Sequence, residues 1–394
     1  MIVLLILTYL TFIGMGLGDS MLGSAWPAMH GQFGVEAAMA GPLAMIVSGS
    51  TIVATYLSTR ILRRFSTGLV LAVSLSLMSI SALGFSLSGH FFVLCLLAVP
   101  LGFGAGNIDA AGNGFLAMHY SARQMSWLHC FWGVGATAGP AIMAFSLMHL
   151  SGWTMGYRVV GFLQLAVAVS LFVSLSRWKS VPAENEERAE SHTDGAADSP
   201  PRTSALLRLR GARLAVLLFF VTGGMEMTLG LWGSTYLVLA RGIPRDTATS
   251  WLALYYLGIT VGRFLFGFLA ARRSSRSIIR AGQGLIAMGA LAIALPYDGF
   301  LMPGFILLGL GVAPLFPNYV HSTPSLFGKR YTQAMIGLQI VASYAGIMLM
   351  PPLFGLIGGN LGYRLFPIFV GALLAATMLI VTVLYRRQTQ DSGL

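Results

Sequence analysis

The sequence predicts an all-α integral membrane protein with twelve transmembrane helices in two pseudo-symmetric six-helix bundles. Three observations predict this fold class: the scarcity of charge, the number of long apolar runs, and a polar stretch that separates the first six runs from the last six. Of the 394 residues, 56% are hydrophobic and only 9% are charged. A soluble domain carries roughly 25% charged residues because its surface must be polar. A chain with so few charges therefore needs lipid as its solvent.

Each apolar run is long enough to cross a bilayer, which takes about 20 mainly apolar residues in a helix. The first run has no basic residues ahead of it and continues beyond any plausible signal-peptide cleavage site. We therefore interpret it as a spanning helix rather than as a removed leader. The expected spans are 2–29, 38–59, 67–88, 91–118, 124–148, 155–176, 214–240, 248–270, 277–296, 300–322, 332–357 and 362–385.

The polar stretch at 177–213 holds six of the thirteen acidic residues and a Pro–Pro step, and it has too few apolar residues to form a core. It predicts a flexible cytoplasmic linker between two domains. The expected organisation is an N-terminal six-helix bundle at 1–176, this linker, and a C-terminal six-helix bundle with a short cytoplasmic tail at 214–394.

The distribution of Lys and Arg predicts the orientation. If both termini are cytoplasmic, nineteen of the 24 basic residues lie on the cytoplasmic side, as the positive-inside rule requires. Because these residues cluster at the ends of apolar runs, without stacking aromatics between them, the net charge of +11 does not indicate nucleic-acid binding. We expect a monomeric multi-pass protein in the lipid bilayer of a cell inner (plasma) membrane.

Four short matches between the two halves indicate an internal duplication. The matched positions are separated by 207 to 211 residues in every case. Gly and Leu are common in membrane helices, so the shared separation carries more weight than any single match. The matches pair Asp19–Gly23 with Glu226–Gly230, 101–104 with 308–311, Gly135 and Pro140 with Gly346 and Pro351, and Arg63 and Arg64 with Arg272 and Arg273.

Three of the thirteen acidic residues, Asp19, Asp109 and Glu226, lie within expected spans. An ionisable side chain near the bilayer centre costs about 2.5–3.5 kcal/mol on insertion scales, so it must face a cavity, pair with another group or carry a proton. Each of the three shares a helix face with glycines, which let neighbouring helices approach and turn the acid toward the bundle. An acid that only bonds a neighbouring helix is the structural alternative.

A carboxyl group in such a place is a candidate for proton coupling. Burial disfavours the charged form of a carboxyl group, which then binds and releases a proton near neutral pH. The expected proton-coupling residues are Asp109, Asp19 and Glu226. Sodium is an open alternative as coupling ion, because the sequence does not show whether several oxygen ligands converge. No metal site and no cofactor are expected.

Polar and aromatic side chains on the same helix faces are candidate substrate contacts. His129 and Trp132 share one face of their span, and Asn318 lies in a span with two prolines, whose freed carbonyls must face protein or water. A histidine or tryptophan in such a place can equally be a packing residue. The expected substrate-binding residues are Asp19, Trp26, Asn107, Asn113, His129, Trp132, Glu226, Asn318 and Gln339.

Arg263 is the only Lys or Arg that lies more than a few residues from either end of an expected span. We expect it to extend toward the cytoplasmic interface or to bond carbonyl groups across helices. A structural or gating role is favoured over substrate binding. The residues expected to have gating or structural roles are Arg63, Arg64, Arg263, Arg272 and Arg273.

These residues resemble the major facilitator superfamily across the whole chain. The family's loop after the second helix carries a Gly-x-x-x-Asp-x-x-Gly-Arg-Arg-like pattern. Here YLSTRILRRFSTG keeps Arg63 and Arg64 but lacks the acid, and the loop after the eighth helix keeps Gly262, Arg263, Gly267 and a basic cluster. The missing acid puts the family's cytoplasmic gating ion pair in doubt, but not the fold.

Three stretches are similar to the fucose-permease-like group of sugar–proton symporters: GNIDAAGNGFLAMHYSARQMSWLHCFWGVGATAGP, GGMEMTLGLWGSTYLV and YYLGITVGRFLFG. The group has one acid in its first helix and another in its fourth. This resemblance implies that Asp19 binds substrate hydroxyls and that Asp109 carries the proton. Asp109 stands where fucose permease has Glu, and substrate identity does not transfer with fold.

The sequence thus favours a secondary transporter that works by alternating access, by proton-coupled symport of a sugar or a similar small polar solute. The alternative is a proton-driven antiporter that exports drugs or amphipathic metabolites, which the twenty methionines would suit. An uncoupled facilitator and a non-transporting sensor are further hypotheses. An enzyme is not expected, because no metal-ligand cluster, phosphate loop or nucleophile arrangement is present. Cys95 and Cys130 both fall inside apolar runs and are expected to be reduced.

Overall fold

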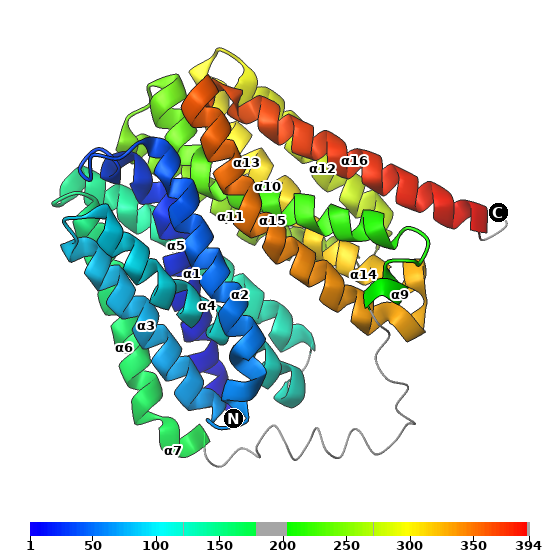
Figure 1. Cartoon of the computed structure of the whole chain (residues 1–394), viewed down its shortest axis with the longest axis horizontal. Helices are drawn as coiled ribbons and strands as arrows, with labels where there is room; N and C mark the ends of the chain where they lie inside the picture. Colours follow the sequence, from blue (N-terminus) through cyan, green and yellow to red (C-terminus); the bar gives the residue numbers. More distant parts are fainter. Residues whose placement is uncertain (121, 179–202, 271, 392–394) are drawn as a thin grey trace. The chain divides into compact units, whose positions relative to one another are not determined.

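The computed structural model describes residues 1–120, 122–178, 203–270 and 272–391, and in these ranges all regular secondary structure is helical. Figure 1 shows the helices coloured along the chain. Among the described residues, twelve helices are long and apolar enough to cross a membrane. This confirms the predicted fold class and the number of spans. The expected linker falls largely outside the described residues.

The N-terminal six spans begin and end within a few residues of the predicted positions. The helices are α1 (Ile2–Met29), η1 (Ala37–Met39), α2 (Ala40–Leu62), α3 (Thr67–Leu87), α4 (Phe91–His119), α5 (Ala122–His149), α6 (Trp153–Val173) and the short α7 (Leu175–Trp178).

The C-terminal spans follow the short helix α9 (Thr203–Leu206). They are α10 (Ala212–Arg241), α11 (Arg245–Ala270), α12 (Ser275–Ala294), η2 (Asp298–Phe300), α13 (Leu301–Val312), α14 (Leu315–Phe327), η3 (Lys329–Tyr331), α15 (Thr332–Leu361), η4 (Tyr363–Leu365) and α16 (Phe366–Asp391).

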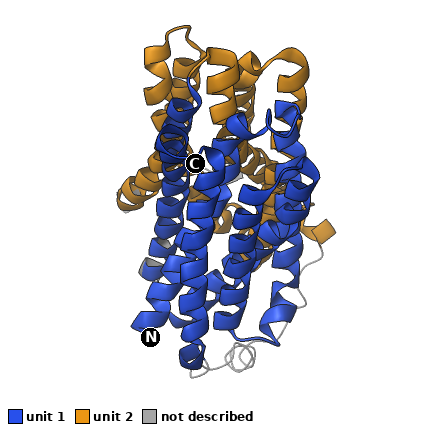
Figure 2. Ribbon diagram, turned by 90° about the vertical axis from the view of Figure 1, so that its left-hand side faces the viewer, with its two compact units in different colours: residues 1–197, 244–253 blue, residues 198–243, 254–394 orange. Residues whose placement is uncertain are grey.

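The chain divides into two compact units (Figure 2). Unit 1 comprises the described residues of 1–197 together with 244–253, which are the first turns of α11. Unit 2 comprises the described residues of 198–243 and 254–394.

Glycines at repeat-related positions bring helices into backbone contact in the same way in both units. In unit 1, a Cβ atom at Gly135 of α5 would overlap the carbonyl oxygen of Ile13 in α1. In unit 2, a Cβ atom at Gly346 of α15 would overlap the carbonyl oxygen of Phe220 in α10. Gly135 and Gly346 are one of the pairs that the internal duplication predicts to be equivalent. Backbone contact through small residues is how membrane helices pack closely.

A second glycine pair repeats this arrangement. A Cβ atom at Gly102 of α4 would overlap the carbonyl oxygen of Val47 in α2, and one at Gly309 of α13 would overlap that of Tyr255 in α11. Gly102 and Gly309 also belong to the predicted repeat. The two units are therefore built from the same helix-packing contacts, as expected of pseudo-symmetric bundles.

The tenth span differs from its prediction because it is broken. The sequence predicted one helix over 300–322, whereas the structure has α13 and α14 with a break at Ala313 and Pro314. Pro314 and Pro317 lack the N–H groups that would continue the helical bonding pattern. The side-chain amide of Asn318 donates to the Pro314 carbonyl oxygen at 2.8 Å. The Pro314 carbonyl oxygen at the break is therefore still hydrogen-bonded.

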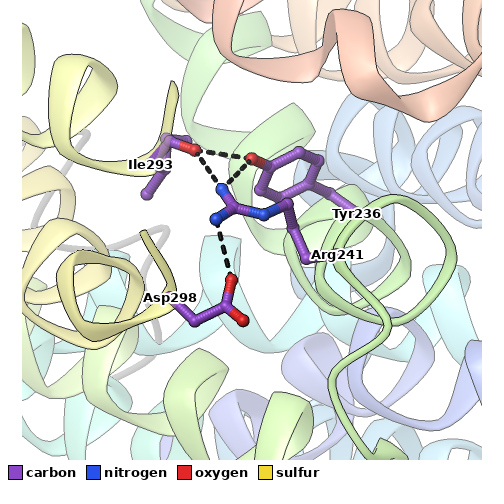
Figure 3. Close-up of polar contacts among 4 residues, drawn as sticks. All are labelled: Tyr236, Arg241, Ile293 and Asp298. Carbon is purple, nitrogen blue, oxygen red and sulfur yellow. Dashed lines mark hydrogen bonds and ion pairs between the residues drawn. The ribbon is translucent and has the colours of Figure 1, made fainter. Parts of the chain in front are cut away.

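A polar cluster connects the end of α10 to the end of α12 and to the start of η2 (Figure 3). One guanidinium nitrogen of Arg241 lies 2.8 Å from the carboxylate of Asp298. The other donates to the Ile293 carbonyl oxygen at 2.9 Å and to the Tyr236 hydroxyl at 3.2 Å. The Tyr236 hydroxyl donates to the same carbonyl at 2.6 Å. A cation near the last carbonyls of a helix is stabilising.

Candidate functional site

Asp19 is the centre of the candidate site in unit 1. Its carboxylate accepts a hydrogen bond from the indole N–H of Trp132 in α5, with 2.9 Å between Oδ2 and Nε1. Asp19 is the only exposed residue between positions 11 and 29 of α1, and all the others except the half-buried Ile13 are buried. The carboxylate therefore occupies a local opening in the part of α1 between positions 11 and 29 that is otherwise packed.

Small residues place Asp19 beside Trp132. Gly16, almost one turn before Asp19, lies against the Trp132 backbone, where a Cβ atom would overlap the carbonyl oxygen of Trp132. Gly135, almost one turn after Trp132, makes the corresponding contact with Ile13. With both glycines at the crossing, α1 and α5 approach closely enough for the indole to reach the carboxylate.

A second carboxyl group, that of Asp109 in α4, lies near enough to Asp19 for their charges to repel. The side-chain amide of Asn113 donates to Oδ1 of Asp109 at 2.9 Å and to the Asp109 backbone carbonyl, also at 2.9 Å. Asp109 and Asn113 are both half-buried. We call Asp19, Asp109, Asn113 and Trp132 the acidic centre of unit 1.

His129 lies on the same helix as Trp132, about one turn earlier, and its side chain is exposed. Its ring meets that of Phe12 edge to face, with 6.3 Å between ring centroids. The histidine is thus accessible at the edge of the α1–α5 crossing.

The third membrane acid, Glu226 in α10, is paired within unit 2. Its Oε1 lies 3.4 Å from a guanidinium nitrogen of Arg263 in α11, and the two side chains are 27% and 22% exposed. The sequence predicted that Arg263 extends toward the cytoplasmic interface or bonds carbonyl groups across helices, and the structure adds a carboxylate partner that this prediction did not include. The reason is that the arginine has a carboxylate within reach, and pairing reduces the cost of both charges in an apolar surrounding.

Two tyrosines that the sequence did not mark as functional lie next to this ion pair. The hydroxyl of Tyr255 donates to the backbone carbonyl oxygen of Glu226 at 3.1 Å. The hydroxyl of Tyr256 lies against Gly230, one turn after Glu226, where a Cβ atom would overlap it. Tyr255 and Tyr256 precede Arg263 by eight and seven residues, so all three fall on the same side of α11. This spacing was the one sign in the sequence that the tyrosines lie beside the arginine.

Breaking the pair from one side should destabilise the protein. We expect Arg263→Gln to lower the free energy of unfolding by about 1–2 kcal/mol, because it leaves a partly buried carboxylate without its counter-ion. Adding Glu226→Gln should restore most of this loss, since the uncompensated charge is then removed. Thermal unfolding in detergent measures both variants, with Arg245→Gln at the exposed start of the same helix as the control. A double variant no more stable than Arg263→Gln alone would contradict the pairing.

Four residues expected to bind substrate are buried in packing positions. Trp26 is fully buried, and its indole donates to the Ala37 carbonyl oxygen at 2.6 Å. Asn107 is 2% exposed and donates to the Phe103 carbonyl oxygen. Gln339 is 1% exposed and accepts from the Thr323 hydroxyl. Asn318 is 8% exposed and bonds at the helix break described above.

The arginines expected to have gating or structural roles lie at helix ends. Arg63 and Arg64 follow α2, and Arg272 and Arg273 follow α11, and all four side chains are exposed. They are not part of the acidic centre.

The family model described as Major Facilitator Superfamily matches residues 8–252 and 214–393. Among relatives, Bypass of stop codon protein 6 of Saccharomyces cerevisiae is 21% identical over 393 residues, covering 92% of this chain and 78% of that protein. The glucose/mannose transporter GlcP of Bacillus subtilis is 22% identical over 342 residues, covering 84% of this chain and 82% of that protein.

The fold is also similar to solved structures. A crystal structure of the peptide transporter POT in complex with sulfate superposes with a TM-score of 0.74, covering 97% of this chain and 94% of that one, at 13% sequence identity. At this identity the likeness shows the fold alone.

Proposed function

Since this chain belongs to the major facilitator superfamily and is therefore a transporter rather than an enzyme, we propose that it moves a sugar or a similar small polar solute together with a proton. The proposed mechanism is alternating access, in which the solute site opens to one side of the membrane at a time.

The observation that carries this proposal is the contact between Asp19 and Trp132. A carboxylate accepts hydrogen bonds from hydroxyl groups, and an indole offers a flat apolar face together with one N–H donor. A sugar presents hydroxyls around its rim and C–H groups on its faces. An exposed carboxylate 2.9 Å from an indole nitrogen therefore suits a polyhydroxylated ring.

Proton coupling is proposed for Asp109. Two nearby carboxylates raise the free energy of the state in which both are charged, so a proton on Asp109 favours a charged Asp19 that can accept from substrate. Asn113 donates to Oδ1 of Asp109 and thereby orients the carboxyl group on which we place the proton.

The remaining assignments follow from position. His129 and Asn113 border the acidic centre and are proposed as further substrate contacts. Glu226 is proposed to act in unit 2 together with Arg263, whereas Trp26, Asn107 and Gln339 are proposed to stabilise helix packing. The name of the relative from Bacillus subtilis, a glucose/mannose transporter, supports a sugar as substrate.

The direction of proton movement tests the proposal. Purified protein in liposomes should raise the external pH when D-glucose or D-mannose is added outside, because protons enter with the sugar. Protein-free liposomes and L-glucose serve as controls, and a pH-sensitive dye follows the change.

External acidification on addition of an amphipathic compound, with no response to any sugar, would instead indicate antiport and contradict the proposed symport. Sugar entry without any pH change would indicate an uncoupled facilitator.

A further inference from the structure

One face of α12 is unpartnered along the whole helix. Residues 277, 280, 281, 284, 287, 288, 291 and 294 are exposed, and they fall on a single side of a 3.6-residue helix. The opposite side is buried and includes Ile279, Ile286 and Ile293. This face is on the outer surface of unit 2, and it contains no residue of the candidate site.

The beginning of this face is strongly basic. Arg272 and Arg273 precede α12, and Arg276 and Arg280 lie in its first turns. In the part of the chain that the structure describes, no carboxylate lies within ion-pair distance of any of the four. Arg276 is held in place by α16, because its guanidinium carbon lies 5.3 Å from the centre of the Tyr385 ring. Positive charge is thus concentrated here without a paired carboxylate among the described residues.

Beyond the arginines the same face is apolar and is open at Gly284. Gly284 follows Arg280 by one turn, and a Cβ atom there would meet nothing within 4 Å. Met288 and Leu291 continue the line and are 56% and 65% exposed. From Arg280 to Leu291 the helix rises about 16 Å, which is about half of a hydrocarbon core roughly 30 Å thick.

We propose that this face binds an anionic phospholipid. Its phosphate would lie at Arg276 and Arg280, and one acyl chain would run over Gly284 along Met288 and Leu291. The charge complements an anionic headgroup, and basic sites between membrane helices attract such lipids. The apolar continuation, one leaflet long, selects a lipid over a soluble phosphate compound. The cytoplasmic position of the arginines follows from the charge distribution of the whole chain.

The test is lipid binding to the purified full-length protein, measured by native mass spectrometry and by thermal stabilisation in detergent. Phosphatidylglycerol should bind and stabilise, whereas phosphatidylcholine with the same acyl chains should do so at least tenfold more weakly. Glycerol phosphate, added alone, provides the headgroup chemistry without the chain. We expect it not to compete at the concentrations at which the lipid binds.

Two variants separate the headgroup and chain contacts. Arg276→Gln with Arg280→Gln should weaken phosphatidylglycerol binding about 30-fold, because each charge contributes about 1 kcal/mol, or about five- to sixfold in affinity. Arg245→Gln with Arg364→Gln removes the same charge at exposed positions elsewhere and should bind as the unaltered protein does. Gly284→Trp places a bulky side chain on the proposed path of the acyl chain and should weaken lipid binding at least tenfold without lowering thermal stability.

The proposal is overturned if the Arg276/Arg280 variant binds phosphatidylglycerol normally, or if the control pair loses binding to the same extent. It is also overturned if Gly284→Trp leaves lipid binding unchanged, or if glycerol phosphate competes as well as the lipid. The last two results would indicate a site for the headgroup alone.

Discussion

Replacing Asp109 with asparagine is expected to abolish concentrative uptake while leaving solute exchange across the membrane intact. With a pH gradient of one unit and one proton per solute, the unaltered protein should accumulate its solute about tenfold, because one pH unit corresponds to about 1.4 kcal/mol. The variant should only equilibrate the solute. Uptake under an imposed gradient and counterflow between equal concentrations measure the two activities.

The physical reason is that asparagine preserves the geometry and removes the titration. In the Asp109→Asn variant, the new side-chain amide oxygen could still accept from Asn113, as Oδ1 of Asp109 does at 2.9 Å. The amide could not gain or lose a proton, so the charge near Asp19 would stay constant through the transport cycle.

Asp246→Asn is a matched control, since it makes the same chemical change in the first turn of α11, away from the acidic centre. It should accumulate solute normally. Uphill uptake by Asp109→Asn equal to that of the unaltered protein would show that another group carries the proton.

Replacing Gly346 with leucine is expected to prevent the folding of unit 2. A side chain at this position would overlap the backbone carbonyl of Phe220, which cannot move away as a flexible side chain can. Separating α10 from α15 by enough to admit leucine should cost more than about 3 kcal/mol, beyond what ordinary overpacking costs. Size-exclusion profiles and thermal unfolding of the solubilised protein measure the loss.

Gly337 lies on the same helix and provides the control, because a Cβ atom there would meet nothing within 4 Å. Gly337→Leu should be neutral or slightly stabilising, since leucine favours the helix by up to about 1 kcal/mol over glycine. If Gly346→Leu and Gly337→Leu gave the same thermal stability, the backbone contact between α10 and α15 would not exist as described.

The spans could be predicted from the sequence because length and hydropathy determine which segments can cross lipid. The first span was predicted at 2–29, and α1 has the same limits. The tenth span was predicted as one helix, yet it is broken at Ala313 and Pro314. Hydropathy does not report hydrogen bonding, so a helix break between apolar residues leaves the apolar signal unchanged.

Side-chain partners were harder to predict because they depend on how each helix is rotated against its neighbours. Trp26 and Trp132 both share a helix face with small residues, but only Trp132 meets an acid, whereas Trp26 bonds the carbonyl of Ala37. Likewise Arg263 and Glu226 are 37 residues apart in sequence, and nothing in the separation indicates their contact. The repeat did predict equivalent glycines, because backbone contacts constrain residue type directly.

The cluster around Arg241 has a consequence for how unit 2 is inserted into a membrane. At the end of α10, the charge of Arg241 is balanced by Asp298, and its guanidinium group donates to a carbonyl oxygen near the end of α12. At the other end of α11, four arginines have no anionic counterpart among the residues the structure describes. The unit is therefore electrically asymmetric along its helices. Moving four arginines that have no carboxylate partner among the described residues across the hydrocarbon core is costly, and this cost favours one topology during membrane insertion.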